Sequence, residues 1–490
     1  MQDTPDTRSE AGHSLDPDDW SAFRKRAHSM LDAAIDHVES ARDRPVWTPV
    51  PDDIKDAIAE PLPMDAQGTD KVCEDLLAQV LPYATGNTHP RFSGWVHGSG
   101  APGGIIADAM ASAMNSNLGG RDHGANYIEH QVINWMKTMF DFPPTSSGLV
   151  VSGTSIATVI ALSAARYAKA DYDIRKQGVR TDKSRLVGYA SSEAHSCIAR
   201  AFDMLGLGID ALRTVPVNDA YEMDIHALRR AIEKDLAAGH QPFCVVGSPA
   251  TVNTGAIDDL NAISEVCQEH DLWFHVDGAF GAVAAMNDTL KPRFTGIERA
   301  DSIAFDFHKW MHVQYDAGCV LIRREDLHRE AFSLRPEYLT AAPRGLAGGN
   351  PWFCEYGPEL SRGFRALKVW FHLKEHGMHK ILQKVEDNCK QAIYLGALVE
   401  AEPNLELLTP VSLNICCFRF VAPAVTDAAL NRLNEDIVMR LQESGIAAPS
   451  TTKLNGQLAI RVNITNHRST KSDFDLLVRE VIKLGKECAV

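Results

Sequence analysis

The chain has 490 residues, of which 45% are hydrophobic and 23% are charged, and its formal net charge is −15. A single core of about 250–300 residues cannot hold this length, so we expect two or three structural units. The acidic balance excludes the basic surface that nucleic acids and anionic membranes require, and no apolar run reaches the roughly 18 residues of a transmembrane helix.

The ten cysteines are scattered without a CxxC pair, and no cysteine–histidine spacing is typical of a metal site. The first twenty residues are polar and acidic and lack the basic and apolar regions of a signal peptide. We therefore predict a cytoplasmic protein with reduced, mostly buried thiols and no metal centre.

Residues 1–85 are predicted to form an N-terminal helical arm. An amphipathic helix is expected over 20–41, and proline-rich breaks follow near 45–51 and 61–63. Such an arm buries little by itself. We expect it to pack on another part of the protein or on a second subunit.

Residues 86–375 are predicted to form a large α/β domain. Short apolar runs predict buried strands at 148–151, 185–189, 243–246, 272–276, 302–305 and 318–322. Helical patterns separate most of them, at 156–169, 226–238 and 262–270. This alternation predicts a mostly parallel central sheet covered on both faces, with ligands beyond the carboxyl ends of the strands.

Residues 376–490 are predicted to form a small C-terminal α+β domain. The expected elements are helix 380–400, strand 412–420, helix 427–444, strand 458–462 and helix 471–484. No internal repeat or low-complexity tract interrupts the chain.

A lysine and an aspartate each follow a predicted strand. Lys309 lies just past strand 302–305, and Asp277 directly ends the preceding strand. Separately, the lysine is usually a solvated charge and the aspartate a cap or turn residue. Together they suit pyridoxal 5′-phosphate (PLP), whose ring nitrogen needs an acid partner to withdraw electrons from a substrate carbon. The small Ala279 would let a flat ring lie against the backbone.

Two further segments complete the pattern. In Ser152-Gly-Thr154-Ser155 a strand runs into a helix, whose N–H groups, hydroxyls and dipole attract an anion. In Ser192-Glu-Ala-His195 the histidine can stack on the open face of a PLP ring. Either segment alone is more often an ordinary cap or turn, so the prediction depends on the combination.

These four segments, in this order, resemble the group II PLP-dependent decarboxylases, which include aromatic-amino-acid, histidine, glutamate and cysteine-sulfinate decarboxylases. The most specific stretches are HVDGAFGA (275–282), DSIAFDFHKW (301–310) and SRGFRALKVW (361–370), and the resemblance covers about residues 50–490. It implies the fold of aspartate aminotransferase (fold type I) and a homodimer with sites at the subunit interface. It also implies PLP-dependent decarboxylation of an L-amino acid to an amine and carbon dioxide.

The resemblance implies a role for each matching residue. Lys309 would hold PLP as a Schiff base, Asp277 would pair with the ring nitrogen and His195 would stack on the ring. Asp306 lies where the family has a polar residue near the cofactor. The implied phosphate contacts are Thr154, Ser155 and His308.

Two segments depart from the family pattern. Near the cofactor a threonine of many members is replaced by Val252, and Thr251 and Asn253 are the two candidates to replace its hydrogen bond. Many members also carry a tyrosine, on a mobile loop before SRGFRALK, that reaches the neighbouring subunit's site and protonates Cα. Counting back from the phenylalanine of that motif places Phe353 there, with Tyr356 three residues away as an alternative donor.

The loop leaves the product open between an amine and an aldehyde. In plant members, phenylalanine at the loop position accompanies aldehyde synthases, which decarboxylate and oxidatively deaminate. The resemblance also places two segments at the mouth of the pocket, where the candidate substrate contacts are Trp95, His97, Gly98, Asn117 and Arg121. Trp95 suits an aromatic substrate and the polar residues suit a polar or acidic one, so the sequence does not name the amino acid.

Two other functions compete with decarboxylation. An aminotransferase of the same fold would hold the α-carboxylate in the plane of the ring with an arginine, for which Arg461 is the candidate. The histidine before Lys309 favours a decarboxylase instead. The intact set of Lys309, Asp277 and His195 disfavours a non-enzymatic descendant of the fold.

Overall fold

The computed structural model of the chain describes residues 14–180, 182–334, 342–349, 351–423 and 425–488. The chain forms two units, residues 1–86 and residues 87–490. The helices of the first unit are α1 (Trp20–Glu39), α2 (Asp52–Ile58) and α3 (Thr69–Asp75), followed by a π-helical turn at Leu76–Val80. Helix α1 begins where the carboxylate of Asp19 accepts the N–H groups of Ser21 and Ala22, and none of its residues is buried.

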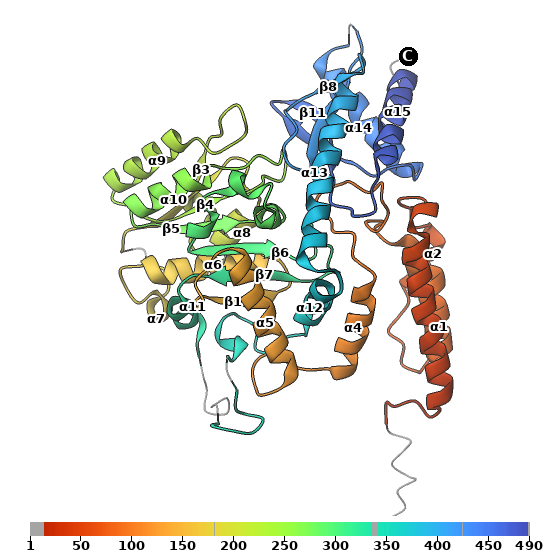
Figure 1. The fold of residues 1–490 in the computed structure, drawn as a ribbon, viewed down its shortest axis with the longest axis horizontal. Helices are drawn as coiled ribbons and strands as arrows, with labels where there is room; N and C mark the ends of the chain where they lie inside the picture. Colours follow the sequence, from red (N-terminus) through yellow and green to blue (C-terminus); the bar gives the residue numbers. More distant parts are fainter. Residues whose placement is uncertain (1–13, 181, 335–341, 350, 424, 489–490) are drawn as a thin grey trace, which may run out of the picture. The chain divides into compact units, whose positions relative to one another are not determined.

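A seven-stranded sheet forms the centre of the second unit (Figure 1). In spatial order its strands are β1 (Ser147–Val151), β7 (Gly318–Ile322), β6 (Ser302–Asp306), β5 (Trp273–Asp277), β4 (Gln241–Gly247), β2 (Leu186–Ser191) and β3 (Leu212–Val215). Neighbouring strands are parallel except at β7, which runs antiparallel to both β1 and β6. The predicted fold class, a mostly parallel α/β sheet with a small second sheet, is confirmed.

Strand β7 is reversed because the connection from β6 is short. Residues 307–317 leave no room for the crossover helix that a parallel return needs. Apart from the connection between β5 and β6, which contains only short 3-10 turns, the other connections of the sheet contain α-helices, which lie on both sides of it (Figure 1). They are α6 (Thr154–Lys169), α7 (Ile174–Gln177), α8 (Cys197–Met204), α9 (Ile225–Ala237) and α10 (Leu260–Glu269). Helix α6 contacts β4, β5, β6 and β7, so its start lies over the strand ends.

Helices before and after the sheet strands complete this part of the unit. They are α4 (Gly103–Met114), α5 (Gly124–Met139), α11 (Glu325–Phe332) and α12 (Arg365–His376). Among the described helices, none has both the length and the apolarity that crossing a membrane requires.

A second, antiparallel sheet lies in the C-terminal part. Its strands are, in spatial order, β10 (Ser450–Leu454), β11 (Gln457–Asn463), β9 (Ile415–Phe420) and β8 (Leu405–Leu407). The helices α13 (Met378–Glu400), α14 (Asp427–Glu443) and α15 (Lys471–Cys488) pack with this sheet around a core that includes Phe418 and Val481. Asn455 and Gly456 join β10 to β11 with positive φ angles of 50° and 84°, as a two-residue hairpin turn requires.

A buried ion pair joins helix α5 to the segment before α12. The Nη1 of Arg362 lies 3.1 Å from Oε2 of Glu129, and both side chains are 1% exposed. Arg362 also donates to the carbonyl of Val150, whose N–H donates to Oε1 of Glu129 at 3.1 Å. The pair therefore connects α5 and β1 to the SRGFRALK segment.

Replacing Arg362 with methionine should lower the free energy of unfolding by roughly 3–5 kcal/mol, because Glu129 would remain buried without its partner. Urea denaturation followed by circular dichroism measures this change. Arg324→Met is the matched control, since its pair with Asp326 is exposed and contributes about 0–1 kcal/mol. Equal losses in the two variants would contradict the importance of burial.

Candidate active site

The carboxylate of Asp306, at the end of β6, joins the start of α6 to the connection between β6 and β7. Its Oδ1 accepts the N–H of Thr154 at 2.7 Å, and its Oδ2 lies 2.8 Å from Nζ of Lys309. Glycine permits this close packing: a Cβ on Gly318 would lie 2.5 Å from Cα of Gly153 and 2.7 Å from Oδ1 of Asp306. One buried carboxylate thus fixes the lysine beside the N-terminus of a helix.

Lys309 and His308 are adjacent in sequence but differ in charge. Burial lowers the pKa of Lys309, but the ion pair with Asp306 outweighs that effect and the pKa is raised, so the side chain is an ammonium at neutral pH. Burial lowers the pKa of His308, whose Nδ1 accepts the N–H of Ala317 at 3.1 Å. Its ring also packs against Tyr315, with centroids 4.3 Å apart. His308 is therefore a neutral ring with its proton on Nε2.

Asp277, at the end of β5, is a buried carboxylate with unused hydrogen-bonding capacity. The thiol of Cys197 donates to its Oδ2 at 3.6 Å, whereas Oδ1 has no partner among the described residues. Burial raises the pKa of Asp277, and the nearby His195 and Lys309 oppose that shift. A buried oxygen without a partner is costly for the fold, and it marks a place where a ligand can donate a hydrogen bond.

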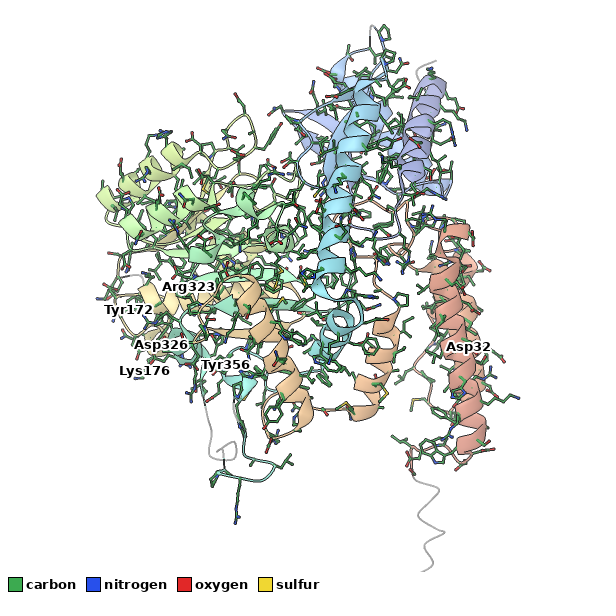
Figure 2. The ribbon with its side chains drawn as sticks, in the orientation of Figure 1. Asp32, Tyr172, Lys176, Arg323, Asp326 and Tyr356 are labelled. Carbon is green, nitrogen blue, oxygen red and sulfur yellow. The ribbon has the colours of Figure 1, made fainter. Side chains whose placement is uncertain are left out.

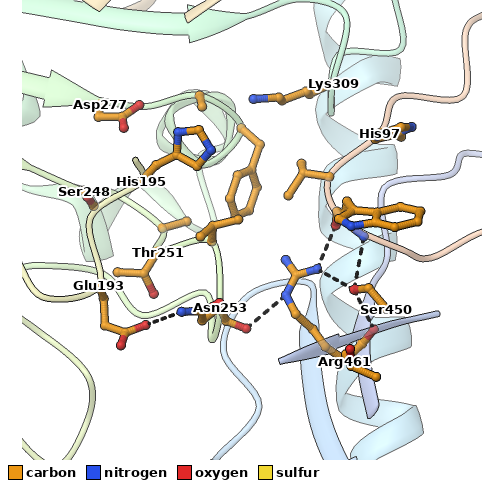
Figure 3. A pocket seen from close by; sticks show the side chains of 17 residues that line it. His97, Glu193, His195, Ser248, Thr251, Asn253, Asp277, Lys309, Ser450 and Arg461 are labelled. Carbon is orange, nitrogen blue, oxygen red and sulfur yellow. Dashed lines mark hydrogen bonds between the residues drawn. The ribbon is translucent and has the colours of Figure 1, made fainter. Parts of the chain in front are cut away.

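Two adjoining cavities open at these strand ends, with volumes of about 360 and 330 Å³. His195, Ala279 and Lys309 line both. The smaller cavity is bordered by the start of α6, from Ser152 to Ile156, together with Asp306 and His308. The larger cavity contains Asp277 on one side and residues of the small sheet on the other (Figure 3).

A series of hydrogen bonds crosses one wall of the larger cavity (Figure 3). The amide Nδ2 of Asn253 donates to Oε2 of Glu193 at 2.9 Å, and Nε of Arg461 donates to the carbonyl of Asn253 at 3.1 Å. Arg461 Nη1 donates to the carbonyl of Trp95 at 2.8 Å. Arg461 is 3% exposed, and burial lowers the pKa of its guanidinium to about 10.

Most of the residues that the sequence nominated line these two cavities. The lining residues are Trp95, His97, Thr154, Ser155, His195, Thr251, Asn253, Asp277, Ala279, Asp306, His308 and Lys309. Gly98 lines neither cavity, but it packs so closely on the carbonyl of His308 that no side chain fits there. Thr251 bonds through its hydroxyl to Thr254 at 3.0 Å rather than toward the cavity.

Besides Gly98, four nominated residues lie outside both cavities of their own chain. Asn117 accepts the N–H of Arg362 at 3.0 Å, and the guanidinium of Arg121 lies 6.0 Å from the ring of Trp352. Phe353 is 2% exposed and packs against the guanidinium of Arg362. The hydroxyl of Tyr356, a residue labelled in Figure 2, donates to Glu325 of α11 at 2.7 Å.

Three of the lining residues that sequence reasoning did not nominate are of different kinds. Glu193 lies two positions before His195 and lines the larger cavity. Its only signal in the sequence was its presence in the segment Ser192-Glu-Ala-His195. Arg461 was considered for one rival function alone, although a lone arginine inside an apolar strand is a signal of a buried polar role. Cys197 carried no signal, because a cysteine in a helix is most often a packing residue.

Comparison with known proteins assigns a family to this arrangement. Residues 51–421 match the model of the pyridoxal-dependent decarboxylase conserved domain. The chain is 32% identical to the aromatic-L-amino-acid decarboxylase of Bacillus atrophaeus, over 96% of both proteins. It is 25% identical to the phenylacetaldehyde synthase of Arabidopsis thaliana, covering 96% of this chain and 98% of that protein. A crystal structure of Oryza sativa TDC with PLP and tryptamine shares the fold, with a TM-score of 0.88 and 24% identity, covering 97% of this chain and 99% of that one.

Proposed function

The chain belongs to the pyridoxal-dependent decarboxylase family, and we propose that it converts an L-amino acid to the amine and carbon dioxide with PLP held by Lys309. One observation above all supports this proposal. The ammonium of Lys309 and the unpartnered carboxylate oxygen of Asp277 face one cavity, beside a helix N-terminus that faces the adjoining one.

The polar groups of the site suit PLP. The buried hydroxyl of Thr154 and Oδ1 of Asp277 have no partner among the described residues. A phosphate oxygen would accept from the first, and a protonated ring nitrogen would donate to the second. Ser155 at the start of α6 and the neutral His308 add donors at the phosphate end. We therefore place the phosphate in the smaller cavity and the substrate in the larger one.

Each residue then has a chemical task. PLP, when bound, withdraws the electron pair left at Cα as the carboxylate departs. The negative charge of Asp277 would keep the ring nitrogen of PLP protonated, and His195 lines the space shared by the two cavities. Asp306 retains Lys309 at the strand end, where its ammonium can move a proton to or from the substrate nitrogen.

The bonding of Arg461 disfavours an aminotransferase. Its Nε and Nη1 already donate to the backbone carbonyls of Asn253 and Trp95, which leaves Nη2 alone without a partner among the described residues. A guanidinium that clamps a carboxylate needs two parallel N–H groups. Arg461 is better suited to positioning the cavity wall.

An aldehyde synthase is the second candidate. One relative of this chain is a phenylacetaldehyde synthase, and Phe353 stands where the resemblance expects a tyrosine. A phenylalanine cannot deliver a proton to Cα, so oxygen could react there first. Amine formation remains the principal proposal, with Tyr356 as the proposed proton donor to the neighbouring subunit, for which its hydroxyl would have to leave Glu325.

The exposed apolar side chains of the first unit support a homodimer. Trp20, Phe23, Leu31 and Ile35 of α1 are each at least 38% exposed, although the helix pattern is amphipathic. A second copy of the chain would cover this face. Analytical ultracentrifugation should therefore give twice the chain mass of 53.8 kDa. A single-chain mass at micromolar concentration would contradict the dimer.

The ten free thiols support a reducing, cytoplasmic location.

Lys309→Ala should abolish decarboxylation and the visible absorbance of bound PLP, because no other lysine among the described residues lines either cavity. Carbon dioxide release and the absorbance spectrum are the measurements. Lys291→Ala is the matched control, since Lys291 also pairs with an aspartate, Asp141 at 2.9 Å, but does so on the surface. A Lys309→Ala protein with near wild-type turnover would refute the assignment.

Asp277→Asn and Asp258→Asn should fail in different ways. Asp277→Asn should lower kcat by roughly 100-fold or more, because it removes the charge beside the ring nitrogen. Asp258 accepts the N–H groups of Met223 and Ser248, both at 2.8 Å. Its replacement should cost about 1–3 kcal/mol of unfolding free energy and leave kcat per bound cofactor nearly unchanged. Equal losses of kcat would remove the distinction.

The wild-type protein should release amine and carbon dioxide in equal amounts without peroxide. Tyr356→Phe should raise the peroxide yield, because the proposed donor to Cα is lost, whereas Phe353→Tyr should leave the products unchanged. Amine, aldehyde, ammonia and peroxide are measured for all three proteins. Peroxide from the wild type that falls in Phe353→Tyr would favour the aldehyde synthase. Identical products from all three would exclude both residues as controls of protonation.

A further inference from the structure

Two carboxylates line the larger cavity among the described residues, and only one has a proposed role. Asp277 lies at the cofactor end, whereas Glu193 lies on the segment between β2 and α8 (Figure 3). Asn253 holds Oε2 of Glu193 at 2.9 Å. No described residue donates a hydrogen bond to the other oxygen, Oε1, and Glu193 is only partly buried, so this oxygen is available to a molecule in the cavity.

The cations of the cavity do not neutralise Glu193. Lys309 pairs with Asp306, and Arg461 donates to two backbone carbonyls and to the hydroxyl of Ser450. None of the ion pairs between described residues includes Glu193. A carboxylate without a counter-ion in a partly enclosed space attracts hydrogen-bond donors and cations and repels a second carboxylate.

We propose that Glu193 selects the substrate by accepting a hydrogen bond from its side chain. The substrates are then L-amino acids whose side chain carries an N–H or O–H donor, and anionic amino acids are excluded. This inference rests on the proposed decarboxylase function, because it places the substrate in the larger cavity. Its distinctive element is the acceptor: an analogue that lacks the donor leaves Oε1 of Glu193 without a partner in the partly enclosed cavity.

Asn253 makes the substitution of Glu193 by glutamine informative. Its Nδ2 needs an acceptor, so the Oε1 of the new glutamine would take that bond and the Nε2 would face the cavity. The acceptor seen by the substrate becomes a donor with almost no change in volume. The preference for donor-bearing side chains should then be lost, and kcat/KM should rise for substrates whose side chain ends in an acceptor.

The experiment compares kcat/KM of the PLP-loaded wild type and Glu193→Gln on three groups of L-amino acids. The first group carries a side-chain donor and contains histidine, tyrosine, tryptophan and ornithine. The second group carries none and contains phenylalanine, leucine and methionine. The third group is anionic and contains glutamate and cysteine sulfinate. The best wild-type substrates should belong to the first group. In Glu193→Gln the kcat/KM of these donor-bearing substrates should fall by roughly tenfold or more relative to the substrates without a donor. The kcat/KM of the anionic substrates should rise.

Glu265→Gln is the matched control, because Glu265 accepts the Nδ2 of Asn261 at 2.8 Å on the exposed face of α10. Glu265→Gln should keep the wild-type ratios of kcat/KM between the three groups of amino acids. A binding measurement independent of turnover uses the amine products: calorimetry should show that Glu193→Gln weakens tyramine more than phenethylamine.

Three results would overturn the inference. The first is a best wild-type substrate whose side chain has no donor. The second is a ratio of kcat/KM between the first two groups that does not change in Glu193→Gln. The third is an equal fall of kcat/KM for every substrate, which would give Glu193 a structural role alone. The failure of the proposed function looks different, since it would be the absence of carbon dioxide from every amino acid although PLP is bound.

Discussion

Asp306 gives a partner to two groups that the fold would otherwise leave unpaired. The first N–H groups of a helix have no acceptor within the helix, and α6 begins after Gly153, which has no side chain to offer. Asp306 supplies that acceptor from β6 and also neutralises Lys309. The short connection to β7 brings Gly318 against Gly153, where a side chain would clash with the carboxylate of Asp306. The position of Lys309 thus depends on the short connection by which the sheet reverses direction between β6 and β7.

The two aspartates at neighbouring strand ends illustrate how environment separates like groups. Asp306 uses both oxygens within the protein, whereas Asp277 keeps one buried oxygen without a partner. The first carboxylate therefore belongs to the scaffold, and the second carries a cost that a bound donor relieves. A ligand that satisfies Asp277 and the hydroxyl of Thr154 stabilises the folded chain by the free energy of its binding. If PLP is that ligand, as proposed, its retention and the stability of the folded chain are linked.

The sequence was sufficient for the features that depend on local pattern. The strands β1, β2, β4, β5, β6 and β7 are buried on both faces and appear as continuous apolar runs, so their ends, with Asp277 and Lys309, could be located. Strand β3 was missed because it is half-buried and four residues long. The contact of Arg461 with Asn253 could not be foreseen, since 208 positions separate them. Phe353 and Tyr356 were placed by counting, which cannot say which side chains they pack against.

The two ends of the site have different structural origins, and this difference has a functional consequence. The cofactor end comes from strand ends and a helix start of the large sheet alone. The substrate end combines Glu193 and Asn253 of the large sheet with Arg461 and Thr452 of the small one, and Thr452 donates to Oδ1 of Asn253 at 2.9 Å. The small sheet therefore bonds directly to Asn253, and through it to the carboxylate of Glu193, whereas none of its residues lines the smaller cavity. Under the proposed function, selection of the substrate can thus vary through the small sheet while the proposed chemistry at Lys309 is preserved.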